Sequence, residues 1–170
     1  MAYVAPTVRS VGDAVTAADY NIMANDVIAH QSVMSNVVYA TYGTAVSNAT
    51  LTYATSNLSA TITPLSTASR IRVEYHVEGL KVAGDVNTAM NLIVLVGATQ
   101  IATTERNNTY NTGTSADVIF TVNDAFIHSP ATTSATTYTL HFRSTRTQTV
   151  TLHPYGSQSV GHMILTEIPA

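Results

Sequence analysis

Residues 51–78, LTYATSNLSATITPLSTASRIRVEYHVE, decide the fold class. The second half alternates without a break between apolar side chains at 71, 73, 75 and 77 and polar ones at 72, 74, 76 and 78. Such alternation is typical of a strand with one face in a core and the other in water. Pro64 cannot donate to a central ladder, so it ends a first strand over residues 51–63. We therefore predict two antiparallel strands joined by a polar corner.

The same pattern continues from residue 37 to the end of the chain. We predict eight strands, over residues 37–46, 51–63, 70–78, 89–96, 118–126, 137–144, 149–153 and 161–168. Short strands separated by Gly, Pro, Asn and Ser favour a mainly β fold, an antiparallel β-sandwich of the jelly-roll type. Residues 92–96 and 163–165 are apolar on both strand faces, which predicts burial against another subunit. We therefore expect Met163 and Leu165 at an oligomer contact.

The clearest helical pattern covers residues 16–36, after an extended arm. Thr16 with Asp19 three residues later resembles a capping box. An apolar seam follows at helical spacing: Tyr20, Met23, Val27, His30 and Met34. Two heptads are too short for a stable isolated helix, so the seam must pack on its own subunit or on a neighbour. We predict two parts, an anchoring arm and helix over residues 1–36 and a β-domain over residues 37–170.

Composition narrows the class of partner. Charged residues make up 10% of the chain, against about a quarter in typical domains. The net charge is -3 and the basic residues are scattered, so we expect neither a nucleic-acid nor a membrane partner. Cysteine is absent, which excludes disulfides, thiolate zinc sites and thiol nucleophiles and mildly favours a reducing cytosol. We expect no signal peptide, because the first residues lack a basic region followed by an apolar run.

The polar residues predict no reaction centre. Among six histidines, His76 between Glu74 and Glu78 is the best seed for a metal site, although cross-strand pairing is the commoner role. Residues 156–161, GSQSVG, are one residue off a nucleophile elbow and precede a strand rather than a helix. We therefore expect no catalytic residue, no metal ligand and no cofactor, and a protein that is not an enzyme.

Residues 97–116, GATQIATTERNNTYNTGTSA, have only a weak strand signal, and loops of this length are usually functional or partly structured. Asn and Thr surround Tyr110 at the centre of the segment. Such a composition can bind sugar through hydrogen bonds and aromatic stacking, or it can form an ordinary hairpin tip. The candidate ligand residues are Arg106, Asn107, Asn108, Tyr110 and Asn111.

Residues 11–31, VGDAVTAADYNIMANDVIAHQ, resemble an anchoring segment of tailed-phage virion proteins, with the pattern G-[DE]-x-V-T-A-x-[DE]-hydrophobic-N at residues 12–21. TSNLSATITPLSTASRIRV, SPATTSATTYTLHFRS and GHMILTEI resemble the β-domain that often follows that segment. Proteins of this kind are similar to small trimeric jelly rolls of the tumour-necrosis-factor and C1q type. His128 departs from the pattern, which has an acidic residue before the Ser-Pro corner.

The resemblance implies a role in the virion, assembled in the host cytoplasm. The first hypothesis is a homotrimeric capsid decoration or cement protein, or a short fibre, that contacts other capsid or tail proteins. The second is a tail adhesin, a carbohydrate-binding module for a host surface glycan. The third is an enzyme that acts on surface polysaccharide, for which the sequence offers no catalytic constellation. The chain has no elongated shaft, which favours decoration over a long fibre.

Overall fold

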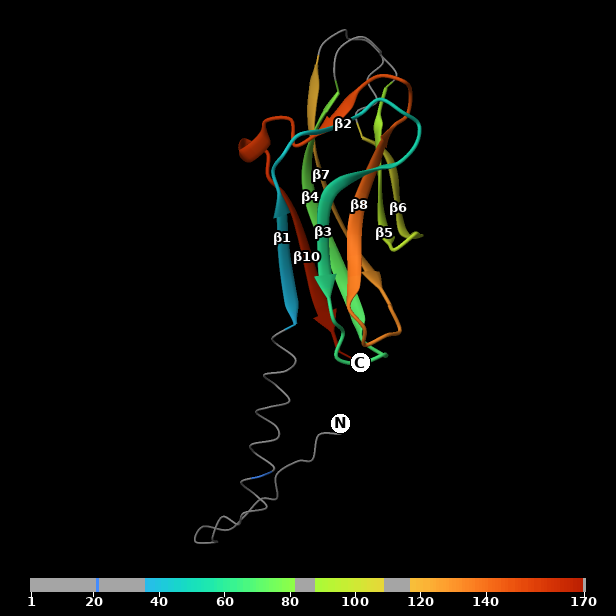
Figure 1. Cartoon of the computed structure of the whole chain (residues 1–170), viewed down its shortest axis with the longest axis vertical. Helices are drawn as coiled ribbons and strands as arrows, with labels where there is room; N and C mark the ends of the chain where they lie inside the picture. Colours follow the sequence, from blue (N-terminus) through green and yellow to red (C-terminus); the bar gives the residue numbers. More distant parts are fainter. Residues whose placement is uncertain (1–20, 22–35, 82–87, 109–116, 170) are drawn as a thin grey trace. The chain divides into compact units, whose positions relative to one another are not determined.

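The structure, a computed structural model, describes residue 21 and residues 36–81, 88–108 and 117–169 (Figure 1). Contacts divide the chain into two units, Met1–Asn36 and Val37–Ala170. In the first unit Asn21 is helical. The seam residues predicted for anchoring lie outside the described residues: Tyr20, Met23, Val27, His30 and Met34.

The described residues of the second unit form ten strands and one short 3-10 helix. The strands are β1 (Val37–Tyr42), β2 (Val46–Asn48), β3 (Ala54–Ile62), β4 (Arg70–Lys81), β5 (Met90–Val96), β6 (Thr99–Asn108), β7 (Val118–His128), β8 (Thr136–Ser144), β9 (Val150–Leu152) and β10 (Gly161–Ile168), with η1 (Gly156–Gln158) between the last two. Within the described part of the chain, no helix has the length and apolar character that a membrane span requires.

Strand β4 organises the larger sheet, which we call sheet A. β7 pairs with β4 along almost its whole length, from Ile71 to Lys81. Two strands pair with successive parts of the other edge of β4: β10 with residues 70–76 and β9 with residues 79–81. β1 and β2 then extend sheet A by pairing with β10 and β9. The predicted strand over residues 37–46 is therefore two strands with two different partners.

The smaller sheet, sheet B, has the order β3-β8-β5-β6. All strand pairs are antiparallel, and neighbours in sequence such as β3 and β4, or β7 and β8, belong to opposite sheets. This is the double-sheet arrangement of a jelly roll. The predicted fold class is confirmed: an antiparallel β-sandwich of two sheets (Figure 1).

The core lies between the two sheets and follows the alternation of the sequence. Its fully buried large side chains are Leu58, Ile62, Ile71, Met90, Leu92, Tyr138, Leu140, Phe142, Leu152, Met163 and Leu165. The inward assignment of residues 71, 73, 75 and 77 in β4 is confirmed, since all four side chains are buried. Met163 and Leu165 belong to this core of a single subunit, so their side chains are not available to a neighbour. An oligomer contact on β10 would fall to the alternate residues, Ile164 and Ile168.

The segment predicted as a long loop contains a strand. β6 runs from Thr99 to Asn108 along β5, which corrects the loop expected over residues 97–116. The apolar side chain on the outer face of β5 is also accounted for. Ile93 is 3% exposed, and its register partners are His141 on β8 and Thr103 on β6. Ile93 is therefore already buried within the single chain, and no second subunit is needed for its burial.

Candidate functional site

The outer face of sheet A, meaning the side chains that point away from sheet B, carries the most distinctive set of functional groups. Strand register places these side chains in rows across β1, β10, β4 and β7. The rows are Thr41, His162, His76 and Asn123; then Tyr39, Ile164, Glu74 and Ala125; then Val37, Thr166, Arg72 and Ile127. Each row therefore combines residues that are far apart in the sequence.

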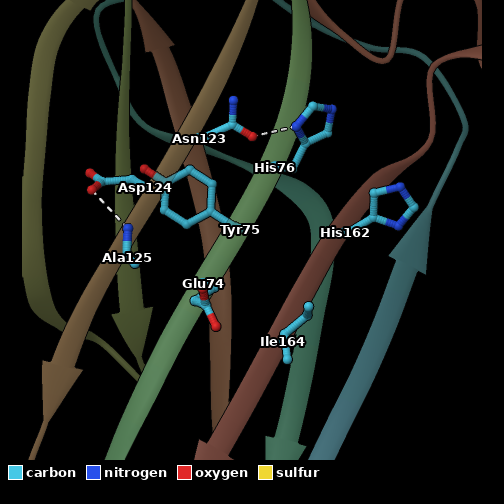
Figure 2. Close-up of a pocket in the computed structure, with 8 residues that line it drawn as sticks. All are labelled: Glu74, Tyr75, His76, Asn123, Asp124, Ala125, His162 and Ile164. Carbon is cyan, nitrogen blue, oxygen red and sulfur yellow. Dashed lines mark hydrogen bonds between the residues drawn. The ribbon is translucent and has the colours of Figure 1, made fainter.

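Two imidazoles meet in the first row. His76 and His162 lie directly opposite each other on β4 and β10, with ring centroids 5.9 Å apart. On one flank, Nδ1 of His76 donates to the side-chain oxygen of Asn123 (Figure 2). On the other flank, Nδ1 of His162 forms a hydrogen bond with the hydroxyl of Tyr39, and these two rings stack at 5.6 Å. Together with Tyr39 from the second row, the first row therefore forms a continuous polar and aromatic cluster across four strands.

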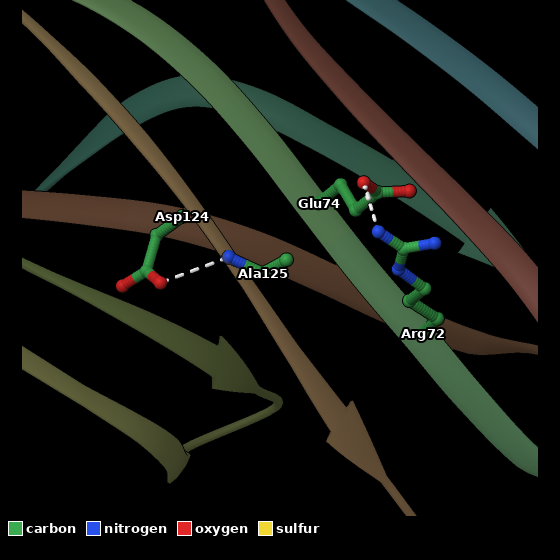
Figure 3. Close-up of polar contacts among 4 residues, drawn as sticks. All are labelled: Arg72, Glu74, Asp124 and Ala125. Carbon is green, nitrogen blue, oxygen red and sulfur yellow. Dashed lines mark hydrogen bonds and ion pairs between the residues drawn. The ribbon is translucent and has the colours of Figure 1, made fainter.

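A groove with a volume of about 420 Å³ lies over this row. Its lining residues are Glu74, Tyr75, His76, Asn123, Asp124, Ala125, His162 and Ile164 (Figure 2). The carboxylates in the groove have partners of their own. Glu74 Oε1 accepts a hydrogen bond from Arg72 at 2.8 Å, and Asp124 Oδ1 accepts one from the backbone N–H of Ala125 at 2.8 Å (Figure 3).

Large apolar side chains border the polar row on the same face. Val37, Tyr39, Ile119 and Ile127 are each more than half exposed, and Ile164 is half-buried between them. Single exposed apolar residues are common, but several on one sheet face mark a contact surface. The outer face of sheet A therefore offers aliphatic and aromatic area together with hydrogen-bonding groups.

A second polar cluster lies buried after β9. The imidazole of His153 is fully buried, and its Nδ1 donates to the carbonyl of Ser159 at 3.0 Å. Ser159 Oγ in turn donates to Glu78 Oε2 at 2.6 Å. A serine nucleophile would need its hydroxyl on the histidine and access to substrate. Here the hydroxyl bonds the carboxylate directly and Ser159 is buried, so the cluster is structural.

The structure describes only part of the segment proposed for ligand binding. Arg106, Asn107 and Asn108 belong to the backbone of β6, while Tyr110 and Asn111 lie outside the described residues. Of the six histidines, the sequence singled out His76 with Glu74 and Glu78. Glu74 is a neighbour in the groove, whereas Glu78 bonds Ser159 instead. Among the described residues, no three His, Asp or Glu side chains form a group suited to a metal ion.

The partners of His76 escaped sequence reasoning because they come from other strands. His162 and Tyr39 belong to β10 and β1, and Asn123 to β7. The available signal was the alternation of side chains along β10, where His162 and Ile164 alternate with buried Met163 and Leu165. That alternation assigns His162 to the outer face. The strand register that places it opposite His76 cannot be read from either segment alone.

Comparison with known proteins yields structural neighbours only. No protein-family model and no curated protein sequence matches the chain. Among solved structures, the infectious bursal disease virus Gx strain has a TM-score of 0.39 at 12% identity, covering 79% of this chain and 32% of that one. The infectious bursal disease virus VP2 subviral particle has a TM-score of 0.37 at 11% identity, covering 79% and 31%. This chain spans about a third of the length of these neighbours, and the likeness concerns strand arrangement alone.

Proposed function

We propose that this chain is a structural virion protein of a tailed phage, a homotrimeric capsid decoration protein or short fibre. Residues 1–36 anchor it to other virion proteins, and the β-domain assembles through the outer face of sheet A. The motif at residues 12–21 supports the anchoring role because it resembles known virion segments. The jelly roll that follows it is the fold expected from the same resemblance.

The outer face of sheet A is the observation that carries the assembly. Val37 and Ile127 lie in one row, and Tyr39 and Ile164 lie in the next. Burial of apolar area contributes about 25 cal/mol per Å², and a stable interface needs roughly 800 Å² per partner. Protein interfaces combine apolar side chains with hydrogen-bonding groups. The outer face of sheet A has both, with aliphatic side chains on the two flanking strands and hydrogen-bonding groups between them. A closed ring of three copies would bury this face repeatedly without leaving an open edge.

Light scattering coupled to size exclusion tests the assembly. We expect wild type at three times the 18.0 kDa chain mass. The double variant Val37→Asp and Ile127→Asp should be monomeric, because two carboxylates cannot enter an apolar contact without a large desolvation cost. Leu65→Asp is the matched control, since Leu65 is 64% exposed, similar to Ile127 at 55%, but lies in the corner before β4. A monodisperse wild-type monomer, or equal loss of assembly in the control, would refute the proposal.

A further inference from the structure

The segment between β9 and β10 is tied to Glu78 of strand β4. We call residues 153–159 the connecting segment. The backbone N–H of His153 donates to the Glu78 carbonyl at 2.9 Å, and Ser159 Oγ donates to the Glu78 carboxylate at 2.6 Å. Nδ1 of His153 donates to the carbonyl of Ser159 at 3.0 Å. Three hydrogen bonds therefore join both ends of the connecting segment to each other and to one residue of sheet A.

The connecting segment is held by its two buried ends. His153 and Ser159 are buried, whereas residues 154–158 are exposed or half-buried and include η1, drawn in orange-red at the side of the β-domain (Figure 1). The ring of Tyr42 lies edge-on to the His153 imidazole, with centroids 5.8 Å apart. A Cβ on Gly161 would lie 2.2 Å from Cε1 of the imidazole. The site therefore encloses the imidazole closely.

The closed conformation suits a neutral imidazole. Nδ1 of His153 uses its hydrogen on the Ser159 carbonyl, and Nε2 has no hydrogen-bond partner among the described residues. Protonation would add an N–H at Nε2, which would be a buried charged donor without an acceptor. The backbone of His153 also lies in the left-handed region, at φ 54°, which costs energy for a residue with a side chain. An opened segment would hydrate both N–H groups and relieve this strain.

The charges around the ring oppose burial but do not outweigh it. Burial lowers the pKa of His153, while the Ser159 carbonyl and the Glu78 carboxylate on β4 act in the opposite direction. Tyr42 of β1 contributes an uncharged phenol ring, and Gly161 of β10 has no side chain. Opening of the segment would therefore be accompanied by uptake of one proton at His153.

We propose that protonation of His153 opens the connecting segment while both sheets stay folded, so that this segment is a pH-sensitive switch beside β4. Short irregular segments open at lower free energy than core strands. Opening releases Ser159 from Glu78 and removes the imidazole from the ring of Tyr42. The switch does not depend on the trimer, because all of these groups belong to one chain.

Amide hydrogen exchange of the full-length protein, followed by NMR between pH 7.5 and pH 5, tests the switch. The reporting amides are the backbone donors of the segment: His153, Gly156, Gln158 and Ser159. After correction for the intrinsic exchange rate at each pH, their opening constant should rise about tenfold per pH unit below about pH 6.5, because one proton is taken up. Amides of β5 and β8 in sheet B should keep their protection.

Three variants separate protonation from packing. His153→Gln keeps a neutral donor for the Ser159 carbonyl, so its opening constant should not change with pH. His128→Gln is the matched control: burial also lowers the pKa of His128, but this residue faces Ile71 at the far end of β4, and the wild-type dependence on pH should remain. Gly161→Ala crowds the imidazole, so it should increase opening at every pH and leave the dependence on pH unchanged.

Four results would overturn the proposal. They are an opening constant that does not change with pH in the wild type, the wild-type dependence in His153→Gln, loss of that dependence in His128→Gln, or simultaneous loss of protection in the segment and in sheet B. The last result would mean that acid unfolds the whole β-domain rather than the segment. If His153→Gln does not fold, the wild-type profile and the other two variants still decide the case.

Discussion

At the scale of single residues, His153 is the side chain with the clearest consequence for stability. Its backbone has φ 54°, its ring is fully buried, and its Nε2 has no hydrogen-bond partner among the described residues. Burial lowers the pKa of His153, although the Ser159 carbonyl and the Glu78 carboxylate act in the opposite direction. Burial also lowers the pKa values of His128 and His141. Below about pH 6.5 the unfolded chain therefore binds protons that the folded chain does not.

We expect the free energy of unfolding to fall as the pH drops below about 6.5 and to be fully present above it. His153→Gln should reduce this acid loss, because a neutral amide can still donate to the Ser159 carbonyl. His141→Gln should recover less, since its imidazole is only half-buried. Urea unfolding near pH 7.5 and near pH 5 measures the effect. The same difference between the two pH values in wild type and His153→Gln would remove His153 from the explanation.

Sequence reasoning assigned the inward residues of β4 correctly because strand alternation is local. It could not foresee His153, whose burial depends on the close approach of Gly161. His128 is an intermediate case. The resemblance marked it as a departure, and the structure shows its Nδ1 3.0 Å from the hydroxyl of Tyr138. Burial of that tyrosine raises its pKa to about 12, so the hydroxyl keeps its proton as a partner for the imidazole.

At the scale of elements, two glycines let strands approach side chains of their neighbours. A Cβ on Gly161 of β10 would lie 2.2 Å from Cε1 of His153, and one on Gly79 of β4 would lie 2.1 Å from Cζ of Phe120. Phe120 is half-buried on the edge strand β7 and its ring can rotate away, whereas His153 is enclosed and hydrogen-bonded. The two glycine positions should therefore respond differently to the same methyl group.

We expect Gly161→Ala to destabilise the fold by about 1–3 kcal/mol, the usual cost of overpacking, and Gly79→Ala to cost less. Chemical denaturation of both variants beside the wild type gives the comparison. A Gly79→Ala loss equal to or larger than that of Gly161→Ala would mean that the edge strand is held as firmly as the segment between β9 and β10.

Strand β6 shows why element prediction failed in one place. Its residues alternate weakly, so the strand is set by its partner β5 rather than by its own pattern. For β5 the strand itself was predicted, but the burial of its outer face was assigned to the wrong cause. Two apolar faces suggested a subunit contact, but Ile93 is buried within the chain between β6 and β8. Such burial depends on strand order, which a local window of sequence does not contain.

At the scale of the whole molecule, the β-domain holds a complete core of its own. The buried cluster runs from Leu58 to Leu165 and includes strands of both sheets. We expect deletion of residues 1–36 to leave a protein that unfolds cooperatively near the wild-type temperature but no longer binds the particle. Thermal melting and a particle co-sedimentation assay measure the two effects.

Met23→Asp combined with Val27→Asp should weaken attachment in the same assay, because a charged seam cannot pack on an apolar surface. Leu65→Asp is the comparison variant: an exposed β-domain position in the corner before β4, away from the outer face of sheet A, that should leave attachment intact. Full occupancy of the particle by the truncated protein would show that the β-domain docks instead of the arm.

The fold class could be predicted from the sequence because eight alternating segments leave few alternatives to a sandwich. The candidate site could not, because His76 meets His162 only through pairing of β4 with β10. Those strands are separated by most of the domain, and register between distant strands is fixed by the assembled core rather than by either segment.

The shared edge of β4 also has a consequence for the order of folding. β10 is the last of the described strands. It is the one described strand that pairs with β1, and it fills more than half of one edge of β4. Sheet A therefore cannot close during synthesis until residues 161–168 leave the ribosome, and such long-range pairing is slow. A prematurely terminated chain keeps two open strand edges, which invite aggregation. Completed chains alone can then present an intact outer face for assembly.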